Sequence, residues 1–173
     1  LDEVAAISYR LVLDPWVNEG LPDAIRDRPE AQKLIDQQIT NKITVLSLGG
    51  THVIAVLDRS GNIVVGRVVS AENELLPMLT TGSLAGLPIV DAVLSTGEAQ
   101  AATEIVPAEF LAQVGLDDQG LIQLVDTPRA MPAPFDPREG TAGLALMGVR
   151  PLAGADGQVV GAVLSAHLLN NDF

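Results

Sequence analysis

Residues 143 to 170 read GLALMGVRPLAGADGQVVGAVLSAHLLN. Two long apolar runs flank a short turn that contains Gly154, Asp156 and Gly157, a pattern typical of a β-hairpin. Both runs are apolar at nearly every position, without the alternation of a strand that has one face in water. Strands of this kind are covered on both faces, so we expect the hairpin at the centre of a sheet.

The composition narrows the class of protein. The 173 residues favour one domain with a substantial core, and the 47% hydrophobic but only 3% aromatic content predicts a core of Leu, Val, Ile and Ala. A formal charge of -12 argues against binding nucleic acid or an anionic membrane surface. The chain has no cysteine, which excludes disulfides, thiolate metal sites and thiol catalysis and leaves the redox compartment open.

Apolar residues recur at helical spacing over residues 1 to 19 and again from residue 29 onward, with a kink expected at Asp14-Pro15. We therefore predict a helical N-terminal region over residues 1 to 48. The second apolar stripe should pack against the core or against a second copy of the chain, and it consists of Leu34, Ile35, Ile39, Ile43 and Leu46.

Residues 52 to 173 are expected to form the sheet domain. It begins with a hairpin whose strands are 52 to 58 and 63 to 69, joined by a turn with the same Asp and Gly chemistry as the last hairpin. Between the hairpins we predict a helical turn at residues 75–79, short helices at 87–94 and 107–114, a strand at 99–106 and a proline-rich loop at 126–140. Helices segregated from antiparallel strands indicate the α+β class.

Few residues suggest chemistry. Ser165 and His167 would share one face of a strand, so a small hydrolase that also uses Asp126 is a distant hypothesis without a nucleophile-elbow motif. No spacing of His or acidic residues predicts a metal site, and we expect no cofactor. Three cations stand out: Arg67 and Arg150 in apolar runs, and Arg129 in the proline-rich loop. Each needs a surface, a carboxylate partner or a polar pocket, because an unpaired charge is costly to bury.

In order and spacing, most of the chain resembles the single-Cache, PAS-like extracytoplasmic sensor domains of bacterial histidine kinases and chemoreceptors. The features that carry the resemblance are the helix leading into the strand, turn and strand of residues 52 to 67, then Arg150-Pro151-Leu152, then Asp156 to Gly161. The tail His167 to Phe173 looks like the family's exit toward a second membrane helix.

The resemblance implies a five- to six-stranded antiparallel sheet with the long helix across one face. Loops and short helices over residues 70 to 140 would cover a small-ligand pocket on the other face. By position, it implies that the pocket is lined by Arg67, Thr80, Thr127, Arg129, Met147, Val149, Ser165 and His167.

One departure bears on the ligand. Citrate- and dicarboxylate-sensing relatives carry a His shortly after the first Arg and a basic residue two positions before the hairpin's Pro. Here Val68 and Val69 follow Arg67, and Val149 lies two positions before Pro151. We therefore expect a smaller or less charged ligand, such as a monocarboxylate or an amino acid.

The resemblance leads us to expect a sensing domain without catalytic activity, in a transmembrane signalling protein that is most simply a histidine kinase. The resemblance implies an extracytoplasmic location, membrane helices flanking residues 1 to 173, and a homodimer formed through the N-terminal helix. Closure of the 70–140 cover would shift this helix relative to the last strand. The alternative is a dimerisation or protein-interaction module with the same fold and a collapsed pocket.

Overall fold

The computed structural model describes residues 28–46, 50–70, 72–120, 142–154 and 156–170. The helices are α4 (Pro29–Leu46), α5 (Pro88–Thr96), α6 (Ala108–Val114) and α7 (Asp117–Gly120). The strands are β1 (Val53–Asp58), β2 (Ile63–Val68), β3 (Gln100–Val106), β4 (Gly143–Ala153) and β5 (Val159–Leu168). The predictions for both hairpins, for the strand near residues 99–106 and for the short helices near 87–94 and 107–114 are confirmed.

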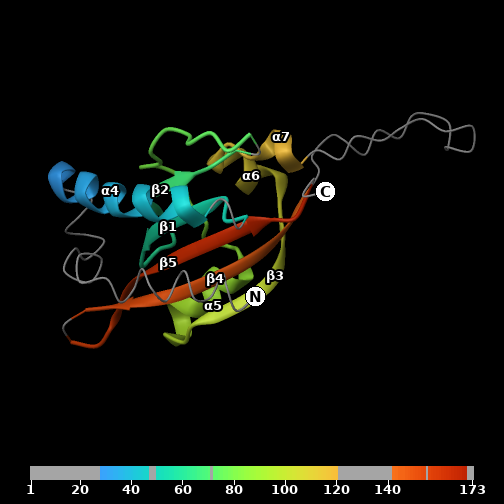
Figure 1. Cartoon of the computed structure of the whole chain (residues 1–173). Coiled ribbons are helices and arrows are strands. Elements are labelled where there is room, and N and C mark those ends of the chain that lie inside the picture. The colour runs from blue at the N-terminus through green and yellow to red at the C-terminus, as the bar shows by residue number, and fades with distance from the viewer. Residues whose placement is uncertain (1–27, 47–49, 71, 121–141, 155, 171–173) are drawn as a thin grey trace, which may run out of the picture.

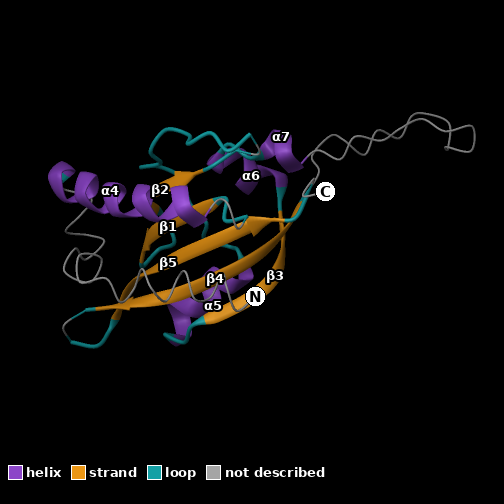
Figure 2. Ribbon diagram, in the orientation of Figure 1, coloured by secondary structure: helices purple, strands orange, loops and turns teal. Residues whose placement is uncertain are grey.

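The strands form one antiparallel sheet with the order β2-β1-β5-β4-β3 (Figures 1 and 2). The last strand in sequence, β5, is the middle strand, which confirms the expectation that the final hairpin lies at the centre. Its backbone groups bond to β1 on one side and β4 on the other. This position explains why β5 is apolar at nearly every residue, since both of its faces are covered.

The segment after β2 is extended and not helical, so the helical turn predicted over residues 75 to 79 is wrong. Leu79 exchanges two backbone hydrogen bonds of 2.9 Å with Gly66, and the Leu76 amide donates to the carbonyl of Val68. The segment therefore follows the outer edge of β2 and pairs with it through isolated bridges. Strand pairing outweighs the local apolar pattern here, because it satisfies backbone groups that β2 would otherwise leave open.

The helix α4 covers one face of the sheet at β1 and β2 (Figure 1). Its residues Ile35, Ile39 and Ile43 recur every four positions and are at most 2% exposed. They pack with strand residues such as Ile54 and Val163. Leu34, which the apolar stripe included, instead points outward and is 49% exposed.

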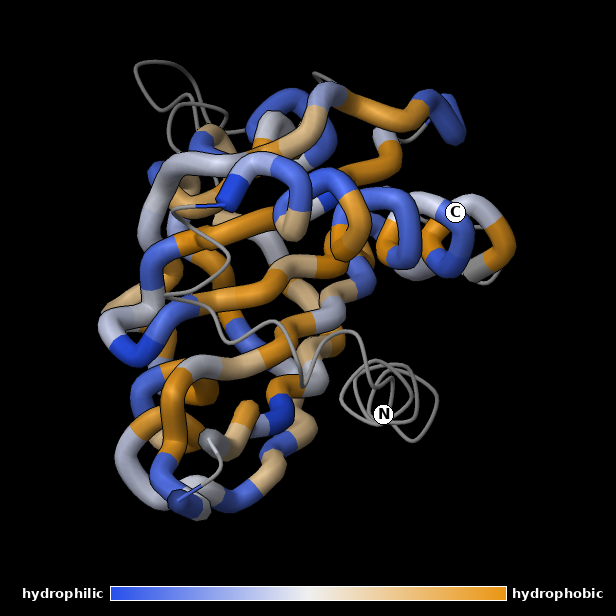
Figure 3. The backbone as a smooth tube through the Cα atoms, turned by 90° about the vertical axis from the view of Figure 1, so that its left-hand side faces the viewer, coloured by the Kyte–Doolittle hydropathy of each residue, from blue (hydrophilic) through white to orange (hydrophobic). Residues whose placement is uncertain are grey.

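The opposite face packs against α5, α6 and the segment that leads to α5. This larger core contains Val53 and Leu57 of β1, Leu164 of β5, and Val90 and Val93 of α5. Figure 3 shows the hydrophobic character concentrated along the strands and the hydrophilic character at the turns. The sheet thus separates two cores, and any site belongs to one face or the other.

Candidate functional site

A cavity of about 30 Å³ lies between the second face of the sheet and its cover. The strands contribute its floor, and α6 with the residues just before α5 and just after α6 contributes its roof. Every lining residue is apolar: Val53, Leu84, Leu87, Val106, Phe110, Leu111, Val114, Leu116, Ala145, Met147, Leu164, Ala166 and Leu168. The space matches about one water molecule in volume but offers no polar partner that would hold one.

The cover is built by local signals in the sequence. Pro88 starts α5, and Gly97 ends it in a left-handed conformation with φ of 71°, so that its amide reaches the carbonyl of Val93. Gly115 ends α6 in the same way with φ of 72°. These two glycines turn the chain immediately after each short helix, and Leu116 then points back into the cavity wall.

The β4–β5 register decides which predicted residues reach this cavity. Ala153 pairs with Val159 next to the turn, and a regular continuation would pair Met147 with Ser165. A bulge at Leu152/Ala153 shifts the ladder by one residue, so Met147 pairs with Ala166 instead. Met147 therefore lines the cavity, and Val149 lies on the same face, fully buried in the adjoining core.

Ser165 and His167 lie on the opposite face of the sheet, because each lies one residue out of phase with Ala166. Their predicted place in the wall of the same pocket as Met147 is therefore wrong. Ser165 is opposite Ile54 on the α4 side and is 0% exposed. The His167 ring meets His52 edge to face, with ring centroids 5.3 Å apart. The amide of Leu168 donates to Nδ1 of His52 at 3.0 Å.

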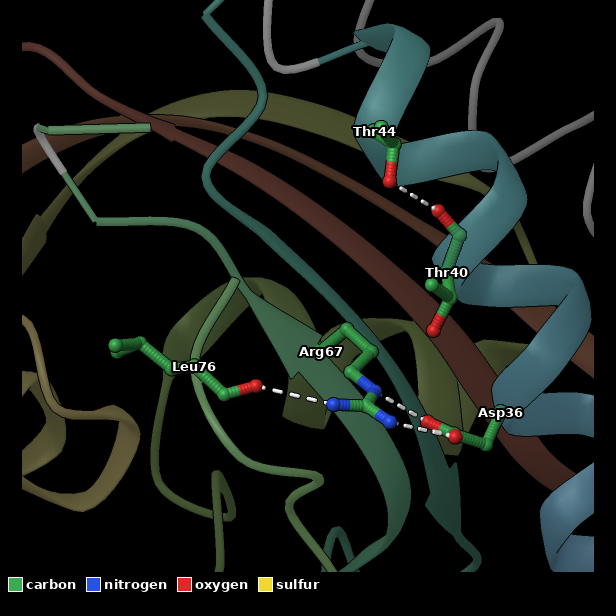
Figure 4. Close-up of polar contacts among 5 residues, drawn as sticks. All are labelled: Asp36, Thr40, Thr44, Arg67 and Leu76. Atoms are coloured by element: carbon green, nitrogen blue, oxygen red, sulfur yellow. Dashed lines mark hydrogen bonds and ion pairs between the residues drawn. The ribbon is translucent and has the colours of Figure 1, made fainter. Parts of the chain in front are cut away.

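Arg67 also lies on the α4 side, which corrects its assignment to the pocket. Its Nε and one terminal nitrogen donate to the two carboxylate oxygens of Asp36 on α4, the second at 2.7 Å (Figure 4). Its other terminal nitrogen donates to the carbonyl of Leu76 at 3.1 Å. The hydrogen bonds to Asp36 raise the pKa of Arg67 above its ordinary value against an opposing effect of burial, and the charge of Asp36 adds to the rise.

The remaining predicted residues do not form part of the described cavity wall. Thr80 is exposed in the segment beside β2. Thr127 and Arg129 lie outside the described residues, as does Asp126 of the hydrolase hypothesis. That hypothesis also requires a reachable hydroxyl, and the Ser165 side chain is fully buried.

Sequence reasoning missed most of the lining, which comes from Leu, Val and Ala side chains with no chemical signature of their own. Ala145 could have been added to Met147 by strand alternation. The partners on β5 required knowledge of the bulge. The roof residues required the fold of the cover.

Among the residues that the structure describes, no three His, Cys, Asp or Glu side chains converge as a metal site requires. None of the helices in this part of the chain is both long and apolar enough to cross a membrane.

No family model matches the sequence, and no curated protein matches it. Among solved structures, the chain is similar to a domain assigned to a sensory box/GGDEF family protein from Vibrio parahaemolyticus, with a TM-score of 0.61 and 12% identity. The match covers 97% of this chain and 53% of that one, so the chain spans about half of the neighbour's length. At this identity the likeness concerns the fold. The chain has an α+β, PAS-like fold with a five-stranded antiparallel sheet.

Proposed function

We propose that this chain is the small-molecule sensing domain of a signal-transduction protein. The observation that carries the proposal is the apolar cavity between the sheet and its cover in a PAS-like fold. Binding sites in proteins are concave, mostly apolar and few per chain. The proposal locates the ligand beside Met147, Ala166 and Leu116, on the face that α4 does not cover.

The lining restricts the ligand. A carboxylate buried among apolar side chains without a partner is strongly disfavoured, so a charged group would stay at the rim. A monocarboxylate or amino acid with an aliphatic part fits this requirement, since its hydrocarbon part would occupy the cavity. Ligand pockets usually measure about 300–1,000 Å³, far above the 30 Å³ of this cavity. Binding therefore requires the cover to move away from the sheet, instead of closing over an open pocket as expected from the resemblance, and this movement is the proposed signal.

The context of the domain belongs to the same proposal. We place it outside the cytoplasm, between membrane helices of a longer protein with histidine kinase output, as the Cache-like order of its elements suggests. The neighbour from Vibrio parahaemolyticus, described as a sensory box/GGDEF family protein, supports a sensory role in general. Reporter fusions to the full-length gene product test the location. Incorporation of phosphate from ATP into that product tests the output.

A thermal-shift screen with short aliphatic carboxylates and amino acids tests ligand binding. A ligand at one hundred times its Kd stabilises the fold by about 2.7 kcal/mol, which raises the Tm by about 5–10 °C. Ala166→Leu fills the cavity and should abolish the shift. Ala101→Leu, at an exposed position of β3, is the matched control and should keep it. If no compound raises the Tm, or if both variants respond alike, ligand sensing in this cavity is rejected.

A dimerisation or interaction module is the second candidate. The exposed side chains Leu34 (49%) and Val45 (68%) favour it. They lie eleven residues apart, about three helical turns, and so occupy the same outer side of α4. A second copy of the chain would cover them. The two functions are compatible, because a dimer through α4 leaves the cavity face free.

A further inference from the structure

Arg67 joins two parts of the molecule that the sheet otherwise separates. Toward α4 it makes a bidentate pair with Asp36, and toward the cover it donates to the carbonyl of Leu76 (Figure 4). Asp36 is 14% exposed and Arg67 18%. At this burial the pair is screened less by salt and water than a surface ion pair.

Leu76 itself faces the cavity side. Its side chain packs against the core that contains the cavity, while its carbonyl points to Arg67. It also lies against the end of α6, because a Cβ placed on Gly115 would be 3.3 Å from Leu76 Cδ1. Gly115 directly precedes Leu116, which lines the cavity. A continuous set of contacts thus runs from the cavity wall around the outer edge of β2 to α4.

We propose that the connection Asp36–Arg67–Leu76 transmits a change in the cavity wall to α4, a regulatory role that rests on the proposed sensing function. The five paired strands of the sheet lie between the cavity and α4. The path along the outer edge of β2 includes one contact that depends strongly on distance, the 3.1 Å hydrogen bond from Arg67 to the carbonyl of Leu76. A displacement of the Leu76 carbonyl by about 0.5 Å would take this contact beyond hydrogen-bond distance. Arg67 would then be held by α4 alone.

The bidentate geometry makes the coupling directional. A guanidinium that faces both oxygens of one carboxylate is fixed in its plane, so Arg67 rotates together with Asp36 and with α4. Asp36 and Arg67 act as positioning residues in this scheme, because neither lines the cavity. The test must therefore measure coupling between two sites, since a loss of stability alone would follow from any structural role.

Hydrogen exchange with mass spectrometry on the whole chain, without ligand, measures this coupling. Leu116→Ala perturbs the cavity wall, and Asp36→Asn removes the charge and one of the two acceptor oxygens of the pair while keeping the shape of the side chain. In the unmodified background, Leu116→Ala should raise exchange in α4 residues 35–43 at least about threefold more than in β5. In the Asp36→Asn background the same change should have less than about half of that effect on α4. The exposed neighbour Gln37→Ala is the control background and should leave the coupling intact.

Three results would overturn the proposal: no selective response of α4 in the unmodified background, a response of equal size with Asp36→Asn, or equal loss of coupling with Gln37→Ala. Leu116→Val replaces Leu116→Ala if the larger truncation prevents folding. Arg67→Lys keeps the charge but loses the planar donors, and should uncouple like Asp36→Asn. Because no ligand is added, a failed ligand screen does not decide this experiment. Lost coupling, conversely, leaves ligand binding to the cavity untouched.

Discussion

Met147 lies directly opposite Ala166 in the β4–β5 ladder, and both side chains line the apolar cavity. Met147 is 5% exposed, so truncating its side chain enlarges a cavity whose wall has no polar group to hold a water molecule. We expect Met147→Ala to lower the free energy of unfolding by about 2–5 kcal/mol, through lost burial and the larger cavity. Urea unfolding followed by circular dichroism measures this difference.

Met78→Ala provides the matched control for this truncation. Met78 is partly buried and packs against the other core, on the α4 side. Its loss should cost about half as much or less, because part of the side chain is already in water. Equal costs for the two variants would mean that the cavity side is no better packed than the periphery.

The elements of the fold were predictable because each has a local signal. The turns of both hairpins contain Asp and Gly, and the buried stripe of α4 follows a four-residue step at Ile35, Ile39 and Ile43. The face on which each hairpin residue lies was not predictable. Both strands of 143–170 are apolar at nearly every position, so no alternation of polar and apolar residues shows which side chains lie on which face of the sheet. A single bulge then moves every residue on one side of it to the opposite face.

The role of Arg67 shows a second limit of local pattern. The sequence identifies a cation in an apolar strand that needs a partner, and both a pocket and a carboxylate would satisfy it. The actual partner, Asp36, is 31 residues away on a helix. Its position is fixed only once α4 packs across β2, so neither spacing nor composition could select it from the other acidic residues.

The Asp36–Arg67 pair should stabilise the fold to the same extent at neutral and at moderately alkaline pH. Asp36→Asn should cost about 1–3 kcal/mol, because it weakens a charge-assisted contact of a partly buried guanidinium. The pKa of Arg67 is raised, so its contribution is complete below the unfolded-state pKa and is lost only as pH rises through the still higher folded-state value. The difference in urea midpoint between the unmodified chain and Asp36→Asn should therefore be the same at about pH 7 and about pH 10. A gap that closes at the higher pH contradicts this assignment.

The two hairpin turns are similar in sequence, but their aspartates differ in burial and in the hydrogen bonds that they accept. Asp58 is 4% exposed and accepts from the amides of Ser60 and Asn62 and from the Asn62 side chain. Asp156 is exposed and accepts from the amide of Gln158. We expect Asp58→Ala to cost about 2–3 kcal/mol and Asp156→Ala less than about 1 kcal/mol. Thermal unfolding of both variants checks the order, and a larger loss at Asp156 would contradict it.

Any side chain introduced at Gly50 would collide with His167. Its φ is 89°, and a Cβ built there would lie 2.2 Å from Cε1 of the His167 ring. Gly50→Ala should therefore be destabilising by more than about 2 kcal/mol, from strain and clash together. Combining it with His167→Ala removes the clash but leaves the strained backbone, so the double variant should be more stable than the two separate losses predict. Strictly additive losses would show that the ring moves aside at no cost.

Leu34 and Val45 predict the site of self-association. Each is exposed on the outer side of α4, while Ile35 and Ile43 on the inner side are buried against the sheet. Replacing both Leu34 and Val45 by Asp should leave folding intact, since neither side chain contributes to the core, and should shift a dimer toward monomer through charge repulsion at the shared surface. Sedimentation velocity at several concentrations measures the shift. The matched control carries Asp at Ile105 and Leu144, which are equally open to solvent but lie on β3 and β4. A control that dissociates in place of the α4 variant would move the proposed dimer contact to that edge of the sheet.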